Sequence, residues 1–300
     1  MLSRLAGSAL VSVMALGISL AAGPAAGQRA SREQQVVVAA VDKGGKTVPG
    51  LSAADFIVRE DGVAREVLRV AQASAPMQIV LLVDTSTDMQ VVLQDARRGL
   101  QAFARGLWAK SPESTITLME FGERPRQIGS PTTDAKVLDG YINGLVEHAG
   151  SGTYLLDALV EASSQLNNRH AERPVIVVFE REASQELSTR FAAQVESAIK
   201  DAHATLWTLV LQEGDRPDTS NERRERDLVL GDTAVHSGGA REALLNRISI
   251  ESRFTQLADR LTSQYAITYS RPESLIPPTK LDVTSKRAGV RIQAPQWIGQ

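Results

Sequence analysis

Oxygen-bearing side chains follow an apolar run in the segment MQIVLLVDTSTDMQ, residues 77–90. Asp84, Ser86 and Asp88 occupy alternate positions directly after the run, and an amphipathic helical pattern begins a few residues later. Carboxylates and hydroxyls at the tip of a buried strand either hold a cation or cap the helix that follows. These residues alone leave both roles open.

Two other segments place polar groups at the ends of structural elements. In GSGTYLLDAL, Gly150 and Gly152 form a loop that presents Thr153 at the start of a helix. In VIVVFEREAS, an apolar strand ends in Glu180 and Arg181. Ligands of open parallel sheets bind outside the carboxyl ends of the strands, so we expect these groups to gather with the first segment. Oxygen ligands from separate loops suit a hard divalent cation, namely magnesium, manganese or calcium.

The elements that position these groups alternate between apolar strands and amphipathic helices. From Val92 to Leu107, apolar residues recur at three- and four-residue steps, which predicts a helix packed on a sheet. Residues 114–130 alternate with period two around Phe121-Gly122, which predicts a hairpin with one antiparallel strand. Further strands are predicted at residues 78–83, 174–180, 204–212 and 265–270, and further helices at residues 134–145, 153–167, 186–202 and 248–264. This order predicts an α/β fold with a doubly wound, mostly parallel sheet.

Short β-segments flank this α/β unit. Residues 36–41 are rich in valine, and Asp61-Gly62 marks a tight hairpin because glycine tolerates a positive φ. The tail alternates around Gly289 and is expected to pair with the N-terminal β-segment. We therefore predict a small β-rich domain at residues 28–75, the α/β domain at residues 76–271 and a C-terminal β-segment at residues 272–300.

Two segments late in the chain are interpreted as surface or turn structure. Residues 213–227 lack the apolar content to pack and predict a charged surface loop, within which NERRERD, residues 221–227, is a solvated face. The Gly238-Gly239 pair precedes an expected helix and either makes a structural turn or binds an anion. We favour the structural turn.

The three polar segments resemble the metal-ion-dependent adhesion site of von Willebrand factor type A domains. In that family the site reads Asp-x-Ser-x-Ser, followed by a loop threonine and an aspartate at a strand end. Asp84, Ser86 and Thr153 match this pattern, whereas Asp88 stands at the second serine and Glu180 at the strand-end aspartate. The flanking sequences resemble the bacterial secreted branch often called von Willebrand factor A-related. The resemblance covers most of the chain after the N-terminal segment and implies the doubly wound fold.

The two departures weaken the metal site that the resemblance implies. In the family, hydroxyls touch the metal while the acids mostly hold water around it. A direct bond from Asp88 would satisfy the cation and weaken its capture of a partner's carboxylate, and Glu180 reaches about one methylene further than aspartate. Arg181 could instead pair with Asp88 or Glu182 as an internal cation. Two outcomes stay open: a degenerate site, or a divalent cation at Asp84, Ser86, Asp88, Thr153 and Glu180.

Composition limits the setting in which the protein works. A formal net charge of −2 gives no electrostatic reason to bind nucleic acid, and the absence of cysteine excludes disulfides and thiolate chemistry. Residues 1–27 have one positive charge, an apolar stretch and small residues at the end, the layout of a cleaved secretory signal. An uncleaved membrane anchor is the alternative. We expect a periplasmic or secreted protein without a membrane span after signal removal.

These observations lead to three functional hypotheses. The first is an exported, non-enzymatic module that binds a protein partner through the strand-tip surface. The second is a structural or assembly component of the cell envelope that binds independently of metal. The third is a metal-assisted hydrolase, for which the sequence offers no evident general base and neither a G-x-S-x-G nor a G-x-x-x-x-G-K-[ST] motif. The identity of the partner and the oligomeric state stay open.

Overall fold

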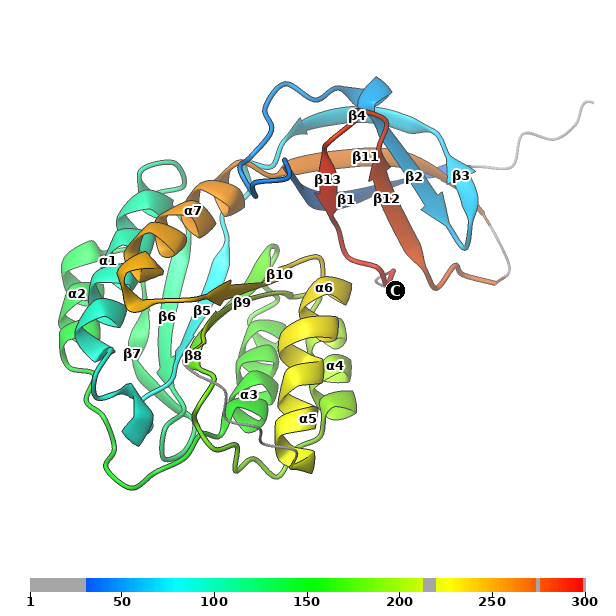
Figure 1. Ribbon diagram of the computed structural model, residues 1–300. Helices are drawn as coiled ribbons and strands as arrows, with labels where there is room; N and C mark the ends of the chain where they lie inside the picture. Colours follow the sequence, from blue (N-terminus) through cyan, green and yellow to red (C-terminus); the bar gives the residue numbers. More distant parts are fainter. Residues whose placement is uncertain (1–30, 213–219, 274–275, 299–300) are drawn as a thin grey trace, which may run out of the picture.

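The computed structural model describes residues 31–212, 220–273 and 276–298. The predicted secretory signal, residues 1–27, lies outside these residues, as does the first half of the predicted charged loop. Within the described part of the chain, no helix is long and apolar enough to cross a bilayer. Figure 1 shows two units, an α/β unit and a unit of small β-sheets beside it.

The α/β unit is built on a six-stranded sheet with the order β10-β9-β8-β5-β6-β7. Its strands are β5 (Gln78–Val83), β6 (Thr115–Glu120), β7 (Arg126–Thr132), β8 (Pro174–Arg181), β9 (Thr205–Leu211) and β10 (Ala240–Leu244). Neighbouring strands pair in parallel except β6 and β7, which form the predicted antiparallel hairpin. The chain passes from β5 to β6 on one side and returns to β8 on the other, so strand order reverses at β5. This confirms the doubly wound sheet and places its switch point at the carboxyl ends of β5 and β8.

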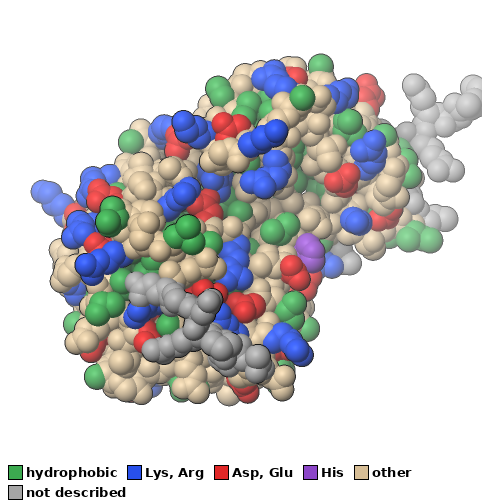
Figure 2. All heavy atoms as spheres, viewed as in Figure 1, with side chains coloured by type: hydrophobic (Ala, Val, Ile, Leu, Met, Phe, Trp, Pro, Cys, Tyr) green, Lys and Arg blue, Asp and Glu red, His purple; other side chains and the backbone are tan. Residues whose placement is uncertain are grey.

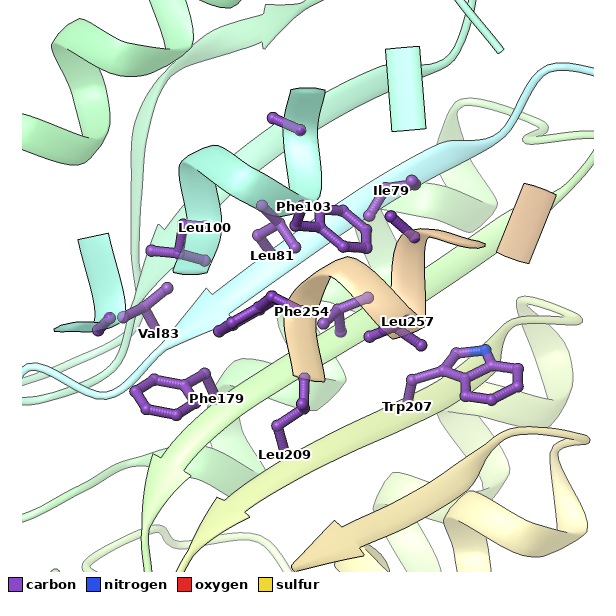
Figure 3. Packing of buried hydrophobic residues seen from close by; sticks show 14 of the residues in the cluster. Ile79, Leu81, Val83, Leu100, Phe103, Phe179, Trp207, Leu209, Phe254 and Leu257 are labelled. Atoms are coloured by element: carbon purple, nitrogen blue, oxygen red, sulfur yellow. The ribbon is translucent and has the colours of Figure 1, made fainter. Parts of the chain in front are cut away.

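Helices cover both faces of this sheet (Figure 1). One face carries α1 (Leu93–Trp108), α2 (Ala135–Asn143) and α7 (Ile250–Thr262), and the other carries α3 (Leu155–Asn168) and α4 (Ala192–Asp201). Strand side chains enter the two layers alternately because successive residues point to opposite faces. In Figure 3, the ring of Phe254 in α7 lies between Phe103 of α1 and Phe179 of β8, with centroid distances of 6.2 and 5.5 Å.

Strand β10 corrects one prediction. The stretch after Gly238-Gly239 was expected to be a helix, but it is the edge strand of the sheet and pairs with β9. A Cβ on Gly239 would lie 1.8 Å from the backbone oxygen of Leu206, so only glycine allows this approach to β9. The pair therefore makes a structural turn.

Helix α5 corrects another prediction. NERRERD, expected to be a solvated loop face, forms α5 (Asn221–Leu228), which continues through the π-helical stretch η3 (Val229–Thr233) into α6 (Ala234–His236). The side chain of Arg226 is only 1% exposed, so a fully solvated segment is excluded. The physical reason is that Arg226 finds carbonyl and carboxyl partners beneath the helix, as described below.

The β-unit consists of two small sheets around a separate apolar core. Their orders are β13-β1-β11-β4 and β12-β2-β3. The strands are β1 (Ser31–Val41), β2 (Phe56–Glu60), β3 (Val63–Arg65), β4 (Val67–Gln72), β11 (Tyr265–Pro272), β12 (Leu281–Ser285) and β13 (Arg291–Gln293). Two C-terminal strands pair with N-terminal ones, β12 with β2 and β13 with β1. Strand β11, expected in the α/β unit, joins this sheet because Ile267 and Tyr269 pack into the β-unit core.

A buried arginine fastens the two units to each other. Arg173, directly before β8, donates hydrogen bonds to the backbone oxygens of Ala73, Ala75 and Leu261 and to the side-chain oxygen of Gln264. Burial lowers the pKa of this guanidinium to about 10. Ala73, Ala75 and Gln264 lie on the two segments that connect the units, and Leu261 lies in the last turn of α7, so Arg173 holds both connections against the end of the sheet. The predicted domain boundaries themselves stay predictions.

Candidate functional site

Asp84 lies at the carboxyl end of β5 and is fully buried. Its Oδ1 accepts a hydrogen bond from the backbone N–H of Ser86 at 2.8 Å, and its Oδ2 accepts one from Oγ of Ser184 at 2.8 Å. Burial raises the pKa of the Asp84 carboxyl, although these hydrogen bonds oppose the rise. Asp84 therefore ties the loop after β5 to the loop after β8.

Ser86 and Ser184 meet directly beside Asp84. Both side chains are buried, and their Oγ atoms lie 3.0 Å apart. Because Ser184 uses its proton to donate to Asp84, Ser86 is the donor in the contact between the two hydroxyls. The three residues form a closed ring of hydrogen bonds at the switch point of the sheet.

Thr153 reaches the same loop from the start of α3. Its backbone N–H donates to the carbonyl of Gln185 at 2.7 Å, and its buried Oγ1 donates to that carbonyl at 3.2 Å. The side chain of Glu186 lies 3.5 Å from Oγ1. Gly152 permits this approach, since a Cβ there would lie 2.6 Å from the Gln185 oxygen. Thr153 is thus engaged by residues that directly follow Ser184.

Glu180 occupies the end of β8 and is fully buried. Neither of its carboxyl oxygens accepts a hydrogen bond from a described residue, and Nε of Arg226 lies 3.9 Å from Oε1. Burial raises the pKa of Glu180 to about 8; Arg226 opposes this rise, whereas the charges of Asp84 and Glu186 add to it. Glu180 therefore holds a proton through most of the neutral range.

Arg226 supplies a cation inside the site. It projects from α5 and donates to the backbone oxygens of Ser184 at 2.6 Å and Glu182 at 2.8 Å. Burial lowers the pKa of its guanidinium, but the nearby carboxyl groups, led by Glu180, raise it by more. Arg223, one turn earlier, pairs with the Glu182 carboxylate at 2.9 Å. Helix α5 thus clamps the loop after β8 with two arginines.

Asp88 stands apart from the buried group. Its side chain is 33% exposed, and its Oδ1 lies 4.0 Å from Nη1 of Arg181. The same guanidinium donates to the backbone oxygen of Asp88. The structure therefore shows the Arg181–Asp88 pairing that the sequence offered as one alternative. The buried internal cation, however, is Arg226.

The residues present do not fit a divalent cation. A hard cation requires several oxygens that are free to coordinate it. Both Asp84 oxygens accept hydrogen bonds, Ser86 and Ser184 bond to each other, and Thr153 is turned to Gln185. Glu180 carries unpartnered oxygens, but the guanidinium of Arg226 already lies beside them, with Nε 3.9 Å from Oε1. Among the described residues, no group of three or more His, Cys, Asp or Glu side chains is spaced to hold a metal.

Three residues of this site were missed in the sequence: Ser184, Glu186 and Arg226. The first two follow Glu180 in an irregular loop, where spacing carries no signal of proximity. Arg226 did leave a signal, because it precedes Val229 and Leu230 by three and four residues and so lies on the buried stripe of the helix. Because arginine is charged, Arg226 was not counted among the residues of the buried stripe.

Apolar side chains are exposed beside the buried group. Leu245 and Ile248 follow the carboxyl end of β10 and are 78% and 88% exposed, and Val91, after β5, is 57% exposed. The Arg247 guanidinium donates to the backbone oxygen of Val91 at 3.4 Å, which joins the two loops. We call Val91, Leu245 and Ile248 the strand-tip apolar surface. Exposed apolar groups on adjoining loops of a rigid sheet are typical of protein contacts.

Comparisons with known proteins identify the domain type of the α/β unit. Residues 79–180 match the family model of the von Willebrand factor type A domain. No curated protein sequence matches the chain. The pilus adhesin SpaC from Lactobacillus rhamnosus GG shares the fold with a TM-score of 0.50 and 9% identity, over 80% of this chain and 46% of that one.

Two further solved structures show similarity at low identity. A von Willebrand factor type A protein from Catenulispora acidiphila has a TM-score of 0.49 and 10% identity, over 88% of this chain and 72% of that one. The corresponding domain of the type V pili tip protein Mfa5 from Porphyromonas gingivalis has a TM-score of 0.49 and 13% identity, over 63% of this chain and 96% of that one.

Proposed function

Because the chain contains a von Willebrand factor type A domain at residues 79–180, we propose that it is a non-enzymatic protein-binding module that needs no divalent cation. The observation that carries this proposal is the closed ring of Asp84, Ser86 and Ser184, with Arg226 as an internal cation beneath it. The side chains of this ring bond to one another and offer no coordination site for a partner's carboxylate, so in this proposal binding uses the surface around the ring.

The strand-tip apolar surface is the proposed contact. Val91, Leu245 and Ile248 present aliphatic groups to solvent at the same edge of the sheet, and their burial would favour association. The partner is a protein with an apolar patch. On the face seen in Figure 2, basic and acidic side chains are interspersed, which does not favour nucleic acid as a ligand.

Burial argues against a hydrolase. The carboxyl groups of Asp84 and Glu180 would be the natural general bases, but both are fully buried, so a substrate has no access to them. The secretory signal expected at residues 1–27 would place the partner in the periplasm or outside the cell.

Capture from an envelope fraction tests the proposal. Immobilised protein should retain the same partner with and without a chelator. The Ile248→Asp variant should bind that partner at least about tenfold more weakly, because it places a charge in an apolar contact. Val63→Asp is the matched control, since Val63 is 56% exposed on the hairpin of the β-unit. Loss of the partner with chelator, or full retention by Ile248→Asp, would contradict the proposal.

A further inference from the structure

The edge of strand β1 is open along most of its length. Strand β11 pairs with β1 from Ser31 to Val38 on one side, whereas β13 pairs on the other side only with Ala39–Val41. No described strand lies beside residues 32–38 on the β13 side. An unpaired edge of seven residues is unusually long. Natural proteins keep open edges short or cover them, because unpaired N–H and C=O groups pair with other chains.

The outward backbone groups of this edge can be identified. The carbonyl of Ala40 accepts from the N–H of Val48, and Val48 must lie on the side away from β13, which occupies the other edge. Ala39 therefore faces β13, and in an antiparallel strand alternate residues face the same side. It follows that Gln35 and Val37 direct their N–H and C=O groups to the open edge.

A proline explains why β13 stops pairing. If β13 continued along β1 in the register that pairs Ala39 with Gln293, Val37 would be the next residue to form hydrogen bonds, and its partner would be Pro295. Proline has no N–H to donate, so the ladder ends there. The chain turns away instead, and Pro295 bridges to Ser237 of the α/β unit. The segment 295–298 thus diverges from β1 and leaves a wedge between them.

This wedge is a cavity of about 320 Å³. Its lining includes the four consecutive residues Gln34–Val37 of β1 together with Pro295, Trp297 and Ile298. The starts of β8 and β9 in the α/β unit and Tyr269 and Arg271 of β11 complete the lining. Side chains of consecutive strand residues point to opposite faces, so a cavity that touches four in a row reaches the edge of the strand as well as one of its faces. The cavity therefore borders Gln35 and Val37, whose outward N–H and C=O groups face the open edge.

We propose that this edge binds an extended polypeptide segment of a protein partner, which pairs with Gln35 and Val37 and places an apolar side chain against Trp297 and Ile298. The bound segment would continue the position of β13 in the sheet, which is binding by β-augmentation. The open edge of β1 repeats its N–H donors and C=O acceptors every two residues. An extended backbone has the same spacing of donors and acceptors, whereas a small ligand does not. A second copy of β1 is disfavoured as the occupant, because segment 295–298 lines the same cavity in each copy. This site is separate from the strand-tip apolar surface.

A defined peptide tests the proposal with the full chain. The probe is acetyl-Thr-Val-Thr-Val-Thr-Val-Thr-amide, and its control carries N-methyl groups on alternate amides. Hydrogen exchange at the Gln35 and Val37 amides is followed as peptide is added. The probe should slow exchange at both amides at least about tenfold with saturation, and the N-methylated peptide should not.

Two variants locate the contact. Gln35→Pro removes an outward N–H without removing a bond to β11, and Gln35→Thr keeps the N–H with a side chain suited to strands. Gln35→Pro should bind the probe at least about fivefold more weakly, which is the factor expected for the loss of one net hydrogen bond. Gln35→Thr should bind the probe as tightly as wild type. If Gln35→Pro unfolds at a lower temperature than wild type, the variant is set aside, and the comparison of the probe with the N-methylated peptide on wild type tests the proposal.

Several results would overturn the proposal. Exchange unchanged by millimolar probe, or equal binding of the N-methylated peptide, would exclude backbone pairing. Amides already protected without peptide at every protein concentration would mean that the chain fills its own edge. Protection that rises with protein concentration alone would identify a second copy as the occupant.

Discussion

Arg226 supplies the positive charge that a divalent ion would bring to this position. Three buried or nearly buried carboxyl groups, Asp84, Glu180 and Glu186, influence its guanidinium, and two backbone oxygens of the loop after β8 accept its hydrogen bonds. A cation on a helix is held permanently, unlike a metal that exchanges with solvent. The charge balance of the site is therefore part of the folded chain.

Removing this cation should strongly destabilise the protein. Arg226→Met removes the guanidinium beside the buried carboxyl groups and leaves the Ser184 and Glu182 carbonyls without their donor, at a cost of about 3–5 kcal/mol in the free energy of unfolding. Arg224→Met is the matched control; Arg224 is exposed on the same helix, so a change within about 0.5 kcal/mol is expected. Urea unfolding of both variants measures this. Equal stability of the two would refute the role given to Arg226.

Glu180 should make stability depend on pH. Its folded pKa of about 8 lies above the ordinary value of 4.5, so between these values the folded chain holds a proton that the unfolded chain has lost. The free energy of unfolding should therefore fall as pH rises from 5 to 8, by up to about 1.4 kcal/mol per pH unit for one proton. Glu180→Gln should flatten this fall. Superimposable pH profiles, measured with chelator, would show that Glu180 is ionised when folded.

Individual site residues were predictable only where chemistry followed a clear element. Asp84 and Ser86 stand directly after a strand that its apolar run reveals, and Thr153 stands directly before a recognisable helix. Ser184 and Arg226 join them through a loop and a charged helix from distant parts of the chain. Such contacts depend on tertiary packing, which local pattern does not encode.

At the level of elements, strong periodicity predicted well and weak periodicity did not. The stripes that became α1 and α7 repeat every three or four residues and pack on one face of the sheet. Strand β10 has only five residues, two of them charged, and it lies at the edge of the sheet. Helix α5 is polar on most sides and is fixed by ion pairs rather than by an apolar stripe.

The approach of β10 to β9 gives a prediction about glycine. Gly239→Ala would place a Cβ 1.8 Å from the Leu206 carbonyl, which must move the edge strand and should cost about 3 kcal/mol or more. Gly231→Ala is the control, because nothing lies within 4 Å of its Cβ position and alanine favours a helix by up to about 1 kcal/mol. Thermal unfolding should separate the variants in opposite directions. A tolerated Gly239→Ala would contradict the observed pairing.

Across the whole molecule, the β-unit and the α/β unit share their connections. The chain enters the α/β unit after β4 and leaves it into β11, and the backbone N–H of Ala73 on the first connection donates to Gln264 on the second at 2.8 Å. Arg173 binds both connections from the α/β unit. The sequence predicted the two kinds of unit, but not this junction, because it depends on backbone oxygens that any residue could supply.

Loss of Arg173 should loosen this junction. Arg173→Met leaves four acceptors without their donor and should cost about 2–4 kcal/mol, with faster hydrogen exchange at the Ala73 amide. Arg169→Met is the control, since Arg169 is exposed and its nearest partners lie within the α/β unit. Unchanged exchange at Ala73 in Arg173→Met would show that the connections hold without the arginine.

The most direct test of the central idea, a strand-tip site that carries its own cation, is calorimetric titration of chelator-treated protein with manganese, magnesium and calcium. Wild type and Asp84→Ala should give the same flat traces up to about millimolar ion, a range that covers typical metal-sensor affinities. Saturable heat in wild type that disappears in Asp84→Ala would show that the ring opens to a metal, and would contradict the account.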